Sequence, residues 1–144
     1  MLKNIPALLG PDLLSTLRAM GHGDEIVIAD ANFPAEYLGP EVIRADGISA
    51  TDMLDAILTV LPLDDFVEEA AIGMAVVGDP NAVPPIFGEF EAILARHEPG
   101  RRFSTVERFA FYARAKSAAA VIQTGEARLY GNIILKKGVI RPKG

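Results

Sequence analysis

The stretch GHGDEIVIADANFP, residues 21–34, decides the fold class. Its centre, EIVIAD at residues 25–30, is a continuous apolar run that ends on an aspartate. Uninterrupted runs of this kind are typical of strands whose two faces are both covered. One of only two histidines in the chain, His22, lies between two glycines directly before the run. The stretch therefore predicts a buried strand and raises the question of what His22 does at its entrance.

Strand-like and helix-like segments alternate along the rest of the chain. Apolar side chains at helical spacing predict four helices, which we expect at residues 11–20, 49–62, 85–97 and 107–118. Short apolar runs predict further strands, which we expect at residues 41–47, 71–78 and within 102–109. The tail, residues 118–138, is typical of two strands around a turn at Thr124-Gly125-Glu126, and so predicts a C-terminal hairpin.

This alternation predicts an α/β fold. We expect a single layered domain over residues 1–144, with a mixed, largely parallel sheet flanked by helices and closed by the C-terminal hairpin. Apolar residues make up 50% of the chain. That is more than a soluble monomer of this size needs, because such a domain buries only about 70% of its unfolded surface. We therefore expect an oligomer in which subunit contacts cover part of the apolar surface.

The composition excludes several classes of function. No apolar run reaches the roughly 18 to 20 residues of a membrane span, and the first residues are too soon interrupted by proline and glycine to form a signal peptide. The chain has no cysteine, which rules out a disulfide framework and a thiolate metal site. The net charge of −5 argues against a general nucleic-acid binder. We expect a cytoplasmic protein that binds neither membrane nor nucleic acid.

The first candidate site combines His22 with Asp24 and Asp30. Gly21 and Gly23 lack a Cβ, which lets the chain turn sharply and present the imidazole at a loop tip. Asp30 follows the carboxyl end of the expected strand, where open α/β sheets usually bind ligands. Two plainer interpretations stay open: His22 is an inert loop residue, and Asp30 is a turn former that bonds to nearby amides.

Two further candidate sites lie in the last third of the chain. Arg108 and Tyr112 are four residues apart and share one face of a helix, although the arginine could merely cover an aromatic core stripe. Tyr130 and Asn132 point to the same side if they lie in a strand, and Gly131 then leaves a gap between them. A phenol and an amide on one face suit hydroxyl recognition, but they would equally suit a sheet edge that faces water.

Signatures of cofactor chemistry are missing from the sequence. It has no Walker-type phosphate loop, no Gly-x-Gly-x-x-Gly after a strand, no Gly-x-Ser-x-Gly elbow and no second histidine spaced to share a metal with His22. One histidine, carboxylates, an arginine, tyrosines and an asparagine remain. This set suits proton transfer on a polar, hydroxyl-rich small molecule, and we expect neither a cofactor nor a metal.

Four motifs in order make the chain resemble the L-fucose mutarotase family, a branch of the superfamily that includes D-ribose pyranase. They are MGHGDEIVIADANFPA, VIRADG, RFAFYARA and TGEARLYGNIILKKGV, and the resemblance extends from about Leu2 to Val139. It implies a cofactor-free isomerase that interconverts the α and β anomers of a monosaccharide, L-fucose or a related pyranose. It also implies a homodecamer built of pentameric rings, with clefts where subunits meet.

The resemblance also implies roles for single residues. His22 would be the catalytic proton donor, and Tyr112 or Tyr130 would be the second proton-transfer group. The sugar-binding residues would be Asp30, Arg108, Tyr130, Gly131 and Asn132. The chemistry agrees, because mutarotation protonates the ring oxygen while the anomeric hydroxyl loses its proton, and an imidazole can serve either step near neutral pH.

Two alternative functions stay open at this point. A D-ribose pyranase would exchange furanose and pyranose forms in a similar site, although the RFAFY motif favours the fucose branch. A non-catalytic monosaccharide sensor would bind the same ligand in order to regulate a partner. His22 argues against the sensor, because a protein that only binds a sugar needs no group for moving protons.

Overall fold

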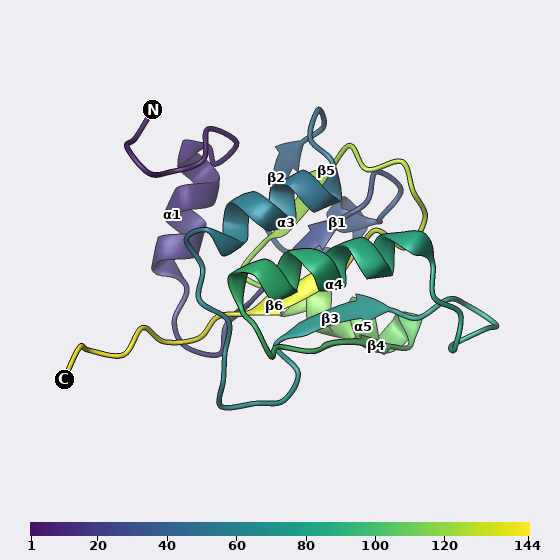
Figure 1. The fold of residues 1–144 in the computed structure, drawn as a ribbon. Helices are drawn as coiled ribbons and strands as arrows, with labels where there is room; N and C mark the ends of the chain where they lie inside the picture. Colours follow the sequence, from purple (N-terminus) through teal and green to yellow (C-terminus); the bar gives the residue numbers. More distant parts are fainter.

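The fold is organised around a six-stranded sheet with the strand order β2-β5-β1-β6-β3-β4 (Figure 1). This computed structural model describes residues 1–144. The strands are β1 (Glu25–Ala29), β2 (Val42–Ala45), β3 (Ala71–Met74), β4 (Phe103–Val106), β5 (Val121–Thr124) and β6 (Ile133–Lys136). β6 is antiparallel to both of its neighbours, β1 and β3, whereas every other pair is parallel. The predicted mixed, largely parallel sheet is confirmed.

The predicted C-terminal hairpin is wrong, because β5 and β6 do not pair. β1 lies between them: Val27 is in register with Val121 of β5 on one side and with Ile134 of β6 on the other. The chain reverses direction after β5, but residues 125–132 carry it across the end of β1. The physical reason lies in β1 itself, whose residues 26–29 have no solvent exposure. A strand without access to water has to form hydrogen bonds along both of its edges.

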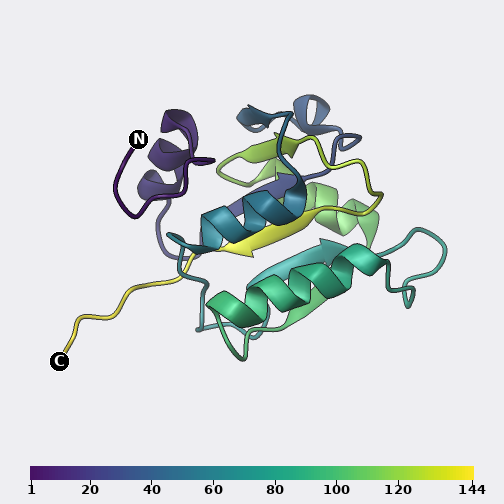
Figure 2. The same ribbon diagram turned by 45° about the horizontal axis from the view of Figure 1, so that its top comes forward.

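Five helices cover the two faces of the sheet (Figure 1 and Figure 2). They are α1 (Pro11–Ala19), α2 (Ala35–Leu38), α3 (Ala50–Leu58), α4 (Pro85–His97) and α5 (Arg108–Lys116). α3 and α4 pack against each other on one face, while α5 and α2 lie on the other. β1 serves both layers: Ile26 and Ile28 join the core beneath α3 and α4, and Val27 and Ala29 join the core beneath α5. Only α2 was not predicted, because four residues show no helical period.

The local sequence explains where these helices begin. Ser49 Oγ accepts a hydrogen bond from the backbone N–H of Asp52 at 3.1 Å, which caps α3 as its spacing predicts. Pro11 occupies the first turn of α1, where the missing N–H has no intrahelical partner to lose. The Glu107 carboxylate caps α5 by accepting from the N–H of Phe109 at 2.8 Å. The first turn of α5 is thereby fixed in place.

The direction of β1 determines which candidate residues can meet. Asp30 follows its carboxyl end, and the parallel strands β3 and β5 end on the same side of the sheet. His22 precedes the amino end of β1. At about 3.3 Å per residue, the length of β1 separates His22 from Asp30 by more than the combined reach of their side chains. None of the helices has the length and apolarity required to cross a membrane.

Candidate functional site

A cluster of buried polar groups surrounds Asp30 at the carboxyl end of β1. The amide of Asn132 forms two hydrogen bonds with this residue: its Oδ1 accepts from the Asp30 N–H at 2.8 Å, and its Nδ2 donates to Asp30 Oδ2 at 3.1 Å. The backbone N–H of Asn32 donates to Asp30 Oδ1 at 2.9 Å, and Gln123 Nε2 donates to the Asp30 carbonyl at 2.5 Å. The orientation of the carboxylate is therefore fixed before any ligand arrives.

Burial raises the pKa of Asp30 above its ordinary value, although hydrogen bonds from the Asn32 N–H and the Asn132 amide oppose the increase. Only 5% of the residue is exposed to solvent. Removing this carboxylate from water disfavours its charge, and the surrounding donors restore part of the lost solvation. Asp30 is therefore a poorly solvated hydrogen-bond acceptor, ready to receive donors from a ligand.

Five of the residues that the sequence singled out line one cavity of about 220 Å³ next to Asp30. They are Asp30, Arg108, Tyr112, Tyr130 and Asn132. They come from the end of β1, the start of α5 and the connection between β5 and β6, so elements distant in sequence converge here. Phe33 and Met74 add an apolar wall. The cavity thus combines hydroxyl-binding groups with apolar surface, as small-molecule sites usually do.

Arg108 presents a guanidinium group that no carboxylate of the chain neutralises. Its central carbon lies 4.6 Å from the centroid of the Phe109 ring, which holds the group from one side. Its Nε is buried and has no hydrogen-bond partner. A buried donor without a partner is unfavourable, and the other guanidinium nitrogens form no hydrogen bond within the chain either, so Arg108 brings an unpaired cation to the cavity that it lines.

Tyr130 and Gly131 do not lie in a strand, which corrects the interpretation of LYGNI. β6 begins only at Ile133, and Tyr130 has a φ of 64°, in the left-handed region. This backbone turn brings the Tyr130 hydroxyl to the N–H of Val77, which donates to it at 3.1 Å. Gly131 leaves no gap either, because a Cβ there would lie 2.8 Å from Cγ of Glu126. The absence of a Cβ at Gly131 lets the backbone pack closely against Glu126.

His22 lies outside this cavity, beyond the amino end of β1. Its Nε2 donates to Oδ1 of Asp64 at 2.9 Å, and its ring lies 4.8 Å from the ring of Phe66. The side chain of His22 is 41% exposed, whereas that of Asp64 is 4% exposed. Within one chain, therefore, the predicted proton donor and the predicted sugar-binding residues form two separate sites.

Asp64 is the most important residue that the sequence did not reveal. Burial acts to raise the pKa of its carboxyl group, but hydrogen bonds from His22 and from the N–H of Phe66 outweigh burial and lower the pKa. The residue lies in the connection between α3 and β3, 42 positions from His22. Nothing local marks it, and the one available signal is an aspartate directly after the alternating apolar residues Leu61 and Leu63. It forms a histidine–carboxylate pair with the exposed imidazole.

Other parts of the surface lack a comparable set of groups. Three cavities are larger: two of about 400 Å³ flank α1 and are lined mainly by aliphatic side chains, and a third of about 410 Å³ lies on the other side of Arg108, where Glu107 and Thr105 are its other polar side chains. The chain has no cluster of three or more histidine, aspartate or glutamate side chains that could hold a metal ion. The polar groups able to bind a small hydrophilic molecule converge instead next to Asp30.

Comparison with known proteins places these features in a family. The model of the RbsD / FucU transport protein family matches residues 3–140. The fucose mutarotase of Bos taurus is 50% identical over 150 aligned residues, which cover 99% of this chain and 97% of that protein.

Solved structures give the same relationship. The fucose mutarotase of Streptococcus pneumoniae, solved in complex with L-fucose, is 43% identical with a TM-score of 0.89, covering 97% of this chain and 100% of that chain. RbsD of Bacillus subtilis, complexed with D-ribose, is 28% identical with a TM-score of 0.74, covering 98% of this chain and 100% of that chain. Sequence and structure are therefore both closer to the fucose mutarotase than to RbsD.

Proposed function

Because the chain belongs to the RbsD / FucU transport protein family, we propose that it is an isomerase that interconverts the α and β anomers of L-fucose. Its 50% identity to a fucose mutarotase over nearly the whole chain supports this activity. The acceptors and donors of the cavity are the types that sugar hydroxyls require. The lower identity of 28% to RbsD makes D-ribose the less favoured substrate.

In the proposed complex, the cavity holds the pyranose through its hydroxyl groups. The Asp30 carboxylate accepts from hydroxyls, and Asn132 keeps that carboxylate in a fixed orientation. Arg108 donates through a guanidinium group that has no partner within the chain. Tyr130 contributes its hydroxyl. Gly131 contributes through its backbone, since the absence of a Cβ lets this segment pack tightly behind the sugar.

The observation that carries the proposal is the convergence of five predicted site residues on one cavity. The separation of the His22–Asp64 pair from that cavity determines how the complete site is assembled. A group that transfers a proton has to come within about 2.6–3.2 Å of the atom that it serves. The His22 of one chain lies at the opposite end of β1 from its own cavity, so we assign the imidazole of each site to a neighbouring copy. A head-to-tail contact of this kind closes into a ring where the rotation between copies allows it. Such a ring is the unit of the proposed decamer of pentameric rings.

Asp64 decides which nitrogen of His22 exchanges protons with the sugar. An ionised carboxylate only accepts, so the hydrogen of the neutral imidazole is on Nε2, which faces Asp64. Nδ1 is then the nitrogen that accepts a proton and, once protonated, donates one. The lowered pKa of Asp64 keeps its carboxylate charged, and this charge stabilises the imidazolium formed in between.

Tyr112 is the second proton-transfer group of the proposed mechanism. It lines the cavity, and its hydroxyl has no partner within the chain, whereas the hydroxyl of Tyr130 already accepts from Val77. One group removes the proton of the anomeric hydroxyl while the other protonates the ring oxygen, so the bond between C1 and the ring oxygen breaks and an aldehyde forms. Rotation about the C1–C2 bond and the reverse transfers close the ring on the other face.

Magnetisation-exchange NMR on L-fucose and D-ribose tests this proposal. Anomer exchange of L-fucose should accelerate on addition of the protein, and more strongly than furanose–pyranose exchange of D-ribose. A reversed order would make the protein a ribose pyranase. Saturation transfer to a bound sugar without faster exchange would make it a sensor. Native mass spectrometry of the same sample tests the decamer.

A further inference from the structure

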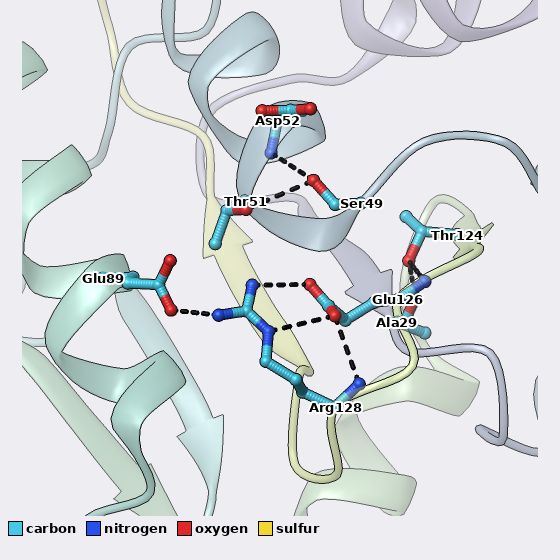
Figure 3. A network of polar contacts seen from close by, with 8 residues as sticks. All are labelled: Ala29, Ser49, Thr51, Asp52, Glu89, Thr124, Glu126 and Arg128. Atoms are coloured by element: carbon cyan, nitrogen blue, oxygen red, sulfur yellow. Dashed lines mark hydrogen bonds and ion pairs between the residues drawn. The ribbon is translucent and has the colours of Figure 1, made fainter.

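Glu126 is a buried carboxylate in the connection between β5 and β6, and the proposed mechanism does not use it. Only 5% of the residue is exposed. Arg128 surrounds its carboxylate with three donors: Nη2 reaches Oε1 at 3.0 Å, while Nε at 3.1 Å and the backbone N–H at 3.2 Å both reach Oε2 (Figure 3). A further nitrogen of the guanidinium, Nη1, binds Glu89 of α4. Arg128 thus links the β5–β6 connection to α4.

The same connection is fastened to the strand that carries Asp30. The Glu126 carbonyl accepts from the N–H of Ala31 at 2.8 Å. The Glu126 N–H donates to the Thr124 hydroxyl at 3.2 Å, and that hydroxyl donates to the Ala29 carbonyl at 2.6 Å (Figure 3). Glu126 is therefore linked to the residues on both sides of Asp30.

The far end of the connection needs such support. Tyr130 has a φ of 64°, a conformation that a non-glycine residue keeps only where its surroundings hold it. Directly after it, Gly131 packs so closely that a Cβ would lie 2.8 Å from Cγ of Glu126 and 3.2 Å from the Arg128 carbonyl. The Glu126 side chain, which the Arg128 guanidinium holds in place, is thus part of the surface against which Gly131 packs, together with Ile86 and the Arg128 carbonyl.

We propose that Glu126 and Arg128 are positioning residues, whose ion pair holds the Tyr130 hydroxyl and the Asn132 amide in the geometry that binds the sugar. This inference rests on the proposed function, in which Tyr130 and Asn132 serve the cavity. Neither Glu126 nor Arg128 lines the cavity, so they act through the backbone between them and the sugar. The pair contributes to substrate binding rather than to proton transfer.

The kinetic test compares Glu126→Gln with the wild-type protein on L-fucose. The amide keeps the shape of the side chain but loses the charge that gathers the three donors of Arg128. KM should rise up to about 10-fold, because displacement of Tyr130 and Asn132 weakens about one hydrogen bond to the sugar. kcat should change much less, because His22, Asp64 and Tyr112 are untouched. Arg128→Met, at a side chain that is 42% exposed, is the second variant and should show the same split.

A spectroscopic test reads the position of Tyr130 directly. The chain has only three tyrosines, so 3-fluorotyrosine labelling gives three ¹⁹F signals, assigned through Tyr37→Phe, Tyr112→Phe and Tyr130→Phe. In Glu126→Gln and Arg128→Met, the Tyr130 signal should shift or broaden while the Tyr37 signal stays in place. The control variant, Asp55→Asn, breaks a remote ion pair between α3 and α4 and should leave KM and all three signals unchanged.

The two readouts separate the possible outcomes. A lower Tm with an unchanged KM and an unchanged Tyr130 signal would reduce the pair to a structural role and overturn the inference. A wild-type protein that fails to exchange fucose anomers would refute the proposed function. In that case a displaced Tyr130 signal would still support the positioning role, and an undisplaced one would refute it.

Discussion

The two ends of β1 each hold a buried aspartate, but the two carboxyl groups differ in electrostatic character. At the carboxyl end, burial raises the pKa of Asp30 despite several hydrogen bonds. Near the amino end, burial also acts to raise the pKa of Asp64, yet donors from His22 and Phe66 outweigh it and lower the pKa. Both residues are at most 5% exposed. The comparison teaches that the balance between burial and the donors supplied by the fold sets the charge of each end: burial prevails at Asp30, and the donors prevail at Asp64.

This difference matches the division of tasks in the proposed mechanism. An imidazole that gains and loses a proton benefits from a partner that stays charged, which is the situation of Asp64. A carboxylate that receives sugar hydroxyls benefits from poor solvation, because it then has much to gain from new donors. The opposite directions in which the two aspartate pKa values move agree with the proposed assignment of proton transfer to one end and substrate binding to the other.

The largest effect should follow from removing the imidazole. His22→Ala deletes the proton-transfer group and should slow fucose anomer exchange by about 10²–10⁴-fold. The side chain is 41% exposed and is not part of the core, so Tm should change little. Magnetisation-exchange NMR gives the rate, and circular dichroism checks the fold. Exchange at the wild-type rate would leave His22 as an inert loop residue.

A smaller loss should follow from changing its partner. Asp64→Asn keeps the size of the side chain but removes the charge that holds the Nε2–H tautomer, and it should slow exchange about 10- to 100-fold with little change in KM. ¹⁵N chemical shifts of the His22 ring should show a mixed tautomer population. Unchanged chemical shifts would mean that the hydrogen bond to Asp64 does not select the tautomer.

Mixing two inactive variants tests whether the two ends meet in one site. His22→Ala chains keep an intact cavity, and Tyr130→Ala chains keep an intact His22–Asp64 pair. If each site draws its two halves from neighbouring copies, random reassembly of equal amounts should restore about a quarter of wild-type sites. Native mass spectrometry verifies that the variants have mixed. Mixed assemblies no more active than the average of their parents would show that His22 does not complete the site of a neighbouring copy.

The sequence predicted the groups that lie at element boundaries and missed the contacts between distant segments. The buried run of β1 indicated its strand, Asp30 follows from the end of that strand, and Arg108 was singled out with Tyr112 by their spacing on one helix face. The order of the strands did not follow, because a fully apolar strand does not specify its neighbours. Asp64 meets His22 only through tertiary structure. Tyr130 was misplaced because the spacing of LYGNI imitates a strand, whereas Tyr130 has a left-handed φ of 64° and the following Gly131 packs against Glu126.

The smallest effect should be a pair of opposite pH dependences in stability. For Asp30, whose folded pKa lies above the ordinary value of 3.8, the stabilising contribution is complete below that ordinary value and is lost as pH rises through the folded pKa. For Asp64, whose folded pKa lies below 3.8, the contribution is present above that ordinary value and is lost as pH falls through the folded pKa. With rising pH, the contribution of Asp30 to the free energy of unfolding should therefore decrease and that of Asp64 should increase.

Urea unfolding of the wild-type protein, Asp30→Asn and Asp64→Asn between about pH 2 and pH 7 measures both contributions. Subtracting the unfolding free energy of each variant from that of the wild-type protein cancels the titration of all other groups. Working at one fixed protein concentration keeps the contribution of assembly the same in each measurement. The stability that the aspartate confers over the asparagine should decrease with pH for Asp30, because ionisation of the buried carboxyl costs free energy there. It should increase with pH for Asp64, because His22 and the Phe66 N–H favour the charged form. Two slopes of the same sign would show that the hydrogen-bond donors do not distinguish the ends of β1, and the assignment of proton transfer to Asp64 and substrate binding to Asp30 would lose its electrostatic basis.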